Sequence, residues 1–93
     1  MTDRRAVKVR ITGQVQGVYY RGWTESEAKR LGLVGWVRNE LDRSVSALLA
    51  GPVGAVAEML RLMHRGPTEA RVEKVVVEEA DLADAPRSFS VRR

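Results

Sequence analysis

The residues best suited to chemistry lie in one short stretch, Gly13-Gln14-Val15-Gln16-Gly17-Val18-Tyr19-Tyr20-Arg21. Its glycines allow the backbone to turn tightly, and the stretch leads directly into a segment with helical spacing. Backbone N–H groups at a helix N-terminus, together with the positive end of the helix dipole, form an anion-binding site. Arg21 adds a planar guanidinium suited to phosphoryl oxygens. The stretch therefore predicts a binding loop for a phosphoryl group.

The remaining residue types exclude several other chemistries. The chain has no cysteine, and its only histidine, His64, falls at a predicted helix end far along the chain from the loop. Disulfides, metal clusters of histidine and cysteine, and Cys–His or Ser–His nucleophile pairs are therefore excluded. The carboxylates are scattered, and while an acid–base pair among them stays open, no spacing favours one. We expect neither a metal nor another cofactor.

Asn39 is the second candidate for the site. It lies where a predicted strand over residues 33–38 meets a hairpin loop. In a split βαβ arrangement this strand runs parallel to the first strand, so both end at the same edge of the sheet. Asn39 and Arg21 are therefore expected to face one pocket.

Hydrophobic periodicity predicts the elements that must position these residues. Val7, Val9 and Ile11 alternate with polar residues, as in a strand with one buried face. Helices are expected over about 21–31 and 52–65, and further strands over 33–38, 44–50, 71–79 and 88–92. In the strand over 71–79, Val75 and Val77 are the expected inward residues. Val72 and Val76 break that alternation, which indicates a bulge or a partly exposed Val76.

The order of these elements predicts a ferredoxin-like α+β sandwich, βαββαβ. It would have a four-stranded antiparallel sheet, two helices on one face and a short terminal edge strand. With 93 residues, of which 44% are hydrophobic, the chain suits a single domain over residues 1–93. No apolar run approaches the ~18 residues of a membrane span, and no secretory signal is recognisable, so we expect a cytoplasmic protein without a membrane partner. The net charge of +4 favours an anionic partner.

These motifs resemble those of the acylphosphatase family, and the resemblance covers nearly the whole chain. The stretch from Gly13 to Arg21 is similar to the family's phosphate-loop signature, G-x-V-Q-G-V-x-[FY]-R. Gly35-Trp36-Val37-Arg38-Asn39 is similar to its second signature, and Gly66-Pro67 with the following 70–75 segment to its run into the fourth strand. The resemblance implies metal-independent hydrolysis of a small-molecule acyl phosphate to a carboxylate and inorganic phosphate. We expect the protein to act as a monomer.

The resemblance also implies a role for each site residue. Arg21 would bind the phosphoryl group together with the backbone N–H groups of Gln16, Gly17, Val18, Tyr19 and Tyr20, while Asn39 would position the attacking water. Physical reasoning agrees, because a carboxylate whose conjugate acid has a pKa of roughly 4 leaves without a general acid. Phosphoryl transfer needs mainly positioning and charge stabilisation. An amide cannot act as a base near neutral pH, so it would orient the water.

The chain departs from the family pattern at two positions. Arg43 stands where the family usually has a glycine in the hairpin loop, and a left-handed conformation there would cost about 1–2 kcal/mol. Gln14 stands where arginine is frequent, which removes one positive charge near the pocket. Tyr19, Tyr20 and Trp23 either line the entrance or cover the sheet and the helix start.

Two other classes of function are compatible with the predicted fold. Ferredoxin-like sheets bind RNA when aromatic side chains on the open face stack on bases, but the strand over 44–50 contains no aromatic residue. We therefore expect no nucleic-acid partner. A phosphate-binding regulatory module without catalysis is the other alternative, and the presence of both Arg21 and Asn39 argues against it.

Overall fold

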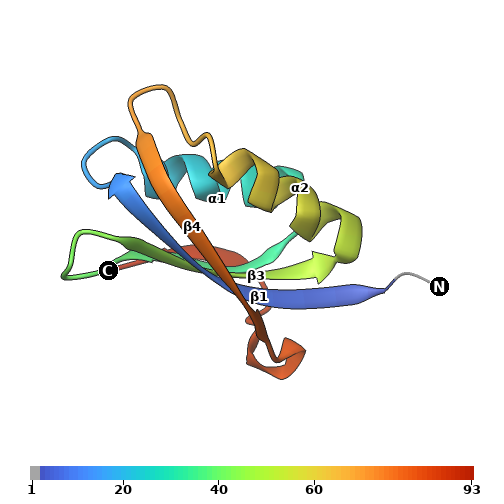
Figure 1. Ribbon diagram of the computed structural model, residues 1–93. Helices are drawn as coiled ribbons and strands as arrows, with labels where there is room; N and C mark the ends of the chain where they lie inside the picture. Colours follow the sequence, from blue (N-terminus) through green and yellow to red (C-terminus); the bar gives the residue numbers. More distant parts are fainter. Residues whose placement is uncertain (1–2) are drawn as a thin grey trace.

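The computed structural model describes residues 3–93, in which two α-helices lie on one face of a five-stranded sheet (Figure 1). The strands are β1 (Arg4–Gln14), β2 (Val34–Asn39), β3 (Val45–Pro52), β4 (Arg71–Ala80) and β5 (Phe89–Arg92). The helices are α1 (Tyr20–Arg30) and α2 (Val53–Met63), with a short 3-10 helix, η1 (Leu82–Asp84), before β5. The predicted ferredoxin-like order is confirmed, with each helix boundary within two residues of the expected one.

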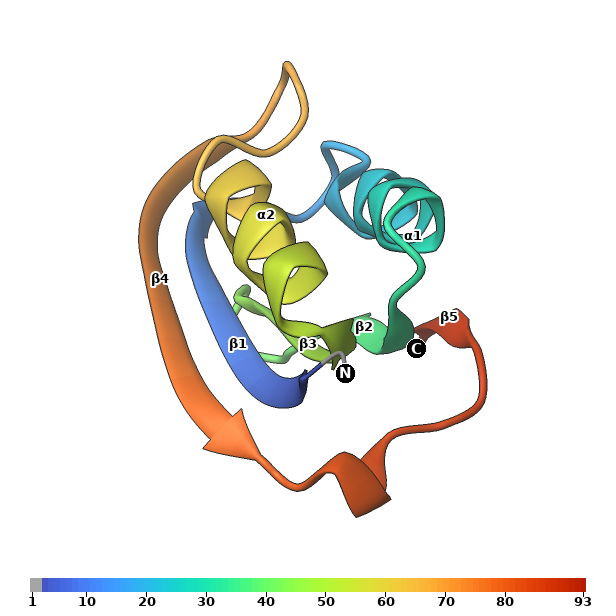
Figure 2. The ribbon, with the colours of Figure 1, turned by 90° about the vertical axis from the view of Figure 1, so that its right-hand side faces the viewer.

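The sheet has the strand order β4-β1-β3-β2-β5. Both β1 and β2 pair antiparallel with β3, so they run parallel to each other and end at the same edge of the sheet. The terminal strand β5 joins the sheet beside β2 and pairs with it in parallel. The sheet therefore has five strands rather than four and is mixed rather than wholly antiparallel, because the segment after β4 crosses to the opposite edge (Figure 2).

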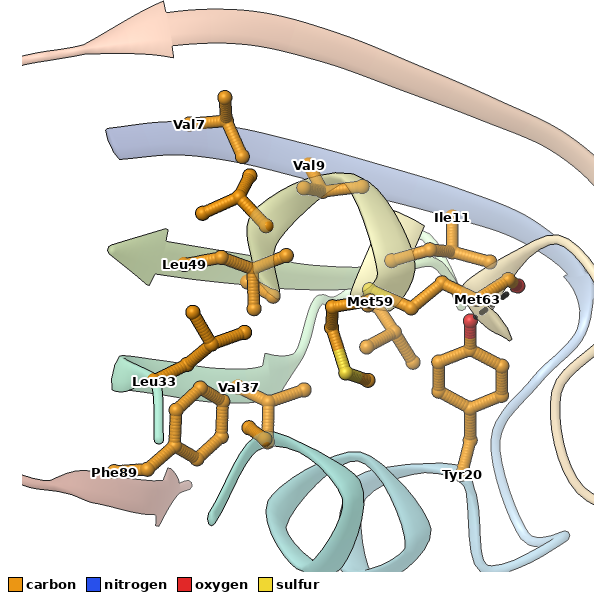
Figure 3. Packing of buried hydrophobic residues seen from close by; sticks show 14 of the residues in the cluster. Val7, Val9, Ile11, Tyr20, Leu33, Val37, Leu49, Met59, Met63 and Phe89 are labelled. Atoms are coloured by element: carbon orange, nitrogen blue, oxygen red, sulfur yellow. Dashed lines mark hydrogen bonds between the residues drawn. The ribbon is translucent and has the colours of Figure 1, made fainter. Parts of the chain in front are cut away.

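The core lies between the sheet and the two helices (Figure 3). Val7, Val9 and Ile11 point toward the helices, as their alternation predicts, and α2 covers them with Val56, Met59 and Met63. The Tyr20 hydroxyl donates to the Met63 carbonyl oxygen at 2.7 Å, which joins the start of α1 to the end of α2. Burial raises the pKa of the Tyr20 phenol well above its usual range, so this donor stays protonated.

β4 contains the predicted bulge, because its pairing with β1 shifts after Thr12 and leaves Glu73 unpaired. The shift places both Val72 and Val75 against the core. Val77 lies on the same face of the sheet as Val9, its partner in β1, as the alternation predicts, but it is 36% exposed. The reason is that β4 is an edge strand, whereas the helices pack mainly on β1, β2, β3 and β5 (Figure 2).

Candidate active site

The loop between β1 and α1 is shaped by residues in the left-handed conformation. Gly17 has φ 75° and Tyr19 has φ 65°, whereas the residues on either side of each have negative φ. Alternation of this kind turns successive N–H groups toward one side and forms an anion-binding concavity. Within residues 3–93 the N–H groups of Gln16, Gly17, Val18 and Tyr19 donate no hydrogen bond to the chain.

α1 begins at Tyr20, directly after this concavity, and its N-terminus adds further free N–H groups. Its first turn contains no acidic residue and receives no side-chain cap, so its leading N–H groups stay free for a ligand. Left-handed backbone costs a residue with a Cβ about 1–2 kcal/mol, and such strain concentrates where a ligand is held. Tyr19 is therefore a strained position inside the loop that the sequence assigns to phosphate.

A pocket of about 300 Å³ opens beside the loop, and Arg21 and Asn39 both lie in its wall. The full set of lining residues is Val15, Gly17, Tyr19, Tyr20, Arg21, Gly22, Asn39 and Val91. None of them carries a carboxylate, so the only formal charge in the wall is the Arg21 guanidinium. The parallel directions of β1 and β2 bring the loop and Asn39 to one edge of the sheet, and this creates an electropositive pocket.

Gln16 and Val18 are not among these lining residues. They line a larger cavity of about 600 Å³, whose wall shares Val15 with the smaller pocket. Glu40, Leu41 and Arg43 of the β2–β3 hairpin complete that wall, which contains neither Arg21 nor Asn39. Because the larger cavity includes a carboxylate and lacks both candidate residues, the smaller pocket is the better candidate for phosphoryl chemistry.

Asn39 is the last residue of β2 and lies on the same side of the strand as Val37, which faces the helices. Its Oδ1 is buried and has no hydrogen-bond partner within residues 3–93. Buried side-chain oxygens nearly always have a partner, so an exception indicates a place for a ligand or a bound water. Because Asn39 is one of the residues that line this pocket, its amide is suited to bind a water beside a bound phosphoryl group.

The side chain of Gln16 fixes the loop to the hairpin that carries Asn39. Its Nε2 donates to the carbonyl oxygens of Glu40 and Ser44, each at 2.9 Å. The sequence predicts only a backbone role for Gln16, and this link was missed because it joins residues far apart in the chain. It holds the two halves of the candidate site at a fixed separation.

The hairpin itself is a turn closed by backbone hydrogen bonds and by Asp42. The N–H of Arg43 donates to the carbonyl oxygen of Glu40 at 3.2 Å. Arg43 has φ 75°, the left-handed conformation that the family's usual glycine at this position predicts. Asp42 accepts from the Ser44 hydroxyl at 2.6 Å and from the Ser44 N–H at 3.0 Å, and it pairs with Arg10. The two Ser44 donors and the Arg10 guanidinium lower the pKa of Asp42 to about 2.

The terminal strand β5 positions Arg21. Its Nη1 donates to the carbonyl oxygen of Arg92 at 3.2 Å, and Val91 of the same strand lines the pocket. The sequence indicated a terminal edge strand but contained no signal that this strand reaches the site. The three aromatic residues Tyr19, Tyr20 and Trp23 lie in different environments. Tyr19 is exposed at the pocket, and Tyr20 is buried in the core. Trp23 packs against Tyr20, with 5.4 Å between the ring centroids.

Two features that would point to a different chemistry are absent from the described range. Between residues 3 and 93, no three His, Asp or Glu side chains gather in a group that could hold a metal ion. Over the same range, neither helix is long and apolar enough to cross a membrane.

Comparison with known proteins gives one family. The Acylphosphatase family model matches residues 7–91. An acylphosphatase of Rhizobium meliloti (strain 1021) is 59% identical over 91 residues, which cover 98% of this chain and 96% of the relative. The structure of an acylphosphatase from Coxiella burnetii matches with a TM-score of 0.92 at 30% identity, over 97% of this chain and 94% of that one. An acylphosphatase from Bacillus subtilis matches with a TM-score of 0.90 at 28% identity, over 95% and 98%. By sequence along almost its full length and by fold, the chain belongs to the acylphosphatase family.

Proposed function

We propose that this protein hydrolyses the carboxyl–phosphate bond of acyl phosphates without a metal, and that the pocket shared by Arg21 and Asn39 is the active site. The observation that carries the proposal is that Asn39, whose buried Oδ1 has no hydrogen-bond partner within residues 3–93, lines the same pocket as Arg21. Family membership supports the class of reaction, and the pocket supports the assignment of the residues.

The first step is binding of the phosphoryl group. Its oxygens accept from the N–H groups of residues 16–20, of which Gly17, Tyr19 and Tyr20 line the pocket, and from the start of α1. Arg21 supplies the compensating positive charge. These donors are fixed before the substrate arrives, because the left-handed conformations of Gly17 and Tyr19 set their directions. Fixed donors stabilise the charge that develops on the equatorial oxygens during transfer, since no reorganisation is needed at that moment.

The second step is attack by water on phosphorus. Asn39 Oδ1 accepts a hydrogen bond from the water and directs one of its lone pairs toward the phosphorus atom. A bond forms between the water oxygen and phosphorus, the bond from phosphorus to the acyl oxygen breaks, and its electron pair leaves with the carboxylate. The proton of the water passes to a phosphoryl oxygen, whose second pKa is about 6. No side chain has to act as an acid or a base.

The structure gives no support to the nucleic-acid alternative. Trp36 is the aromatic residue on the sheet face opposite the helices, but it is only 7% exposed. The guanidinium groups of Arg38 and Arg92 lie 4.8 and 5.1 Å from its ring centroid. A ring covered in this way offers no free face on which a base could stack.

The test is hydrolysis of acetyl phosphate in the presence and absence of a chelator. We expect turnover that the chelator does not change, and its collapse in Arg21→Ala together with weaker competitive inhibition by inorganic phosphate. Arg30→Ala is the matched control, because Arg30 lies at the far end of α1, paired with Glu27. Wild-type turnover in Arg21→Ala, or no turnover in the wild type, would refute the proposal.

A further inference from the structure

We propose that the ring of Tyr19 is a platform for the acyl group, and that the site therefore prefers flat, apolar acyl groups such as aromatic ones. The inference rests on the proposed function, because it assumes that the phosphoryl group lies against the loop. It adds to the proposed function the chemical class of the acyl group that the site prefers.

The backbone of Tyr19 gives the first reason. Its φ of 65° is a conformation that glycine adopts freely and asparagine adopts readily, whereas a bulky side chain is strained there. An aromatic residue at this position is therefore conformationally strained. It also makes no contribution to the core, since Tyr19 is 72% exposed. A side chain that is both strained and exposed beside a candidate active site indicates a role in binding.

Gly22 gives the second reason. A Cβ atom built at Gly22 would lie 2.3 Å from Cε1 and 2.6 Å from Cζ of Tyr19, so the ring lies directly on the backbone of α1 at this glycine. The ring therefore packs against the helix at Gly22, and this contact exists only because residue 22 has no side chain. Such support holds the ring in place and leaves the rest of its surface exposed at the pocket.

The composition of the pocket gives the third reason. Its volume of about 300 Å³ is at the lower end of the range of small-molecule sites. The N–H groups and Arg21 account for the phosphoryl group, and the other exposed parts of the wall are Tyr19 and Val91, which is 38% exposed. With no carboxylate in the wall to attract a cationic acyl group, an apolar group in contact with Tyr19 and Val91 fits best.

The test compares phenylphosphonate with methylphosphonate as ligands of the wild type, Tyr19→Phe and Tyr19→Asn, in parallel with turnover of benzoyl and acetyl phosphate. Asparagine is chosen because it tolerates the left-handed backbone while removing the ring. We expect the wild type and Tyr19→Phe to prefer the phenyl compound. In Tyr19→Asn the preference should fall by about 2- to 10-fold, the contribution of one aromatic contact.

Leu41→Ala is the control, because Leu41 is fully exposed in the wall of the larger neighbouring cavity. Its preference should equal that of the wild type. The platform is overturned if the wild type shows no preference, if Tyr19→Asn retains the preference, or if Leu41→Ala loses it. Because the binding ratio is measured without turnover, an inactive protein would count against the proposed function and not against the platform.

Discussion

Replacing Arg43 with glycine should stabilise the protein. Arg43 has φ 75° in the turn between β2 and β3, a conformation that costs a residue with a Cβ about 1–2 kcal/mol. Its side chain is exposed and forms no hydrogen bond or ion pair within the described residues, so little is lost with it. Glycine also makes the unfolded chain more flexible, which offsets about 0.4–1 kcal/mol of the gain. Subtracting the middle of the second range from the middle of the first leaves a net gain in the free energy of unfolding of about 0.8 kcal/mol.

For a domain of this size, 1 kcal/mol corresponds to a change in Tm of about 4–8 °C, so Arg43→Gly should raise Tm by about 3–6 °C. The measurement is thermal unfolding followed by circular dichroism, with urea unfolding at constant m value as a second readout. Arg43→Ala is the control: it removes the same charge but keeps the Cβ, and it should give no comparable rise. If Arg43→Gly leaves Tm unchanged or lowers it, or if Arg43→Ala raises it equally, the strain argument is refuted.

Two further predictions concern stability. Asp42 has a pKa of about 2, below its ordinary value, so its carboxylate stabilises the fold above about pH 4 and ceases to do so as the pH falls through 2. Asp42→Asn should therefore lower Tm at pH 7 while the difference from the wild type shrinks toward pH 2; a difference that stays constant over this range would contradict the assignment. Tyr20→Phe leaves the Met63 carbonyl without its buried donor and should cost about 1–3 kcal/mol in denaturant unfolding. A loss below about 0.5 kcal/mol would show that this hydrogen bond adds little to stability.

The order of elements could be predicted from the sequence because it depends on local patterns. The alternation of Val7, Val9 and Ile11 and the apolar stripe of α2 each fix which face is buried, and both are confirmed. The extent to which a residue is buried could not be predicted, because it depends on neighbours that are distant in the sequence. Val77 has the right alternation, but only the position of β4 at the sheet edge shows that no helix covers it.

The candidate site likewise has features that could be predicted from the sequence and features that could not. The positions of Arg21 and Asn39 on one edge follow from the directions of β1 and β2, which the element order implies. The contacts that hold these residues do not follow from it. Gln16 reaches the carbonyl groups of a hairpin more than twenty residues away, and Arg21 donates to the last strand. Hydrophobic periodicity cannot predict such contacts, because each joins one side chain to a backbone carbonyl group that is distant in the sequence.

The most direct test of the mechanism is the effect of Asn39→Ala on turnover and on phosphate binding in the same protein. If Asn39 orients the water and does not hold the phosphoryl group, kcat for acetyl phosphate should fall by about 100-fold or more. The inhibition constant of inorganic phosphate should stay within about twofold of the wild type, since its donors are the loop and Arg21. A folded Asn39→Ala protein that keeps wild-type kcat, or that loses turnover and phosphate binding together, would contradict the account.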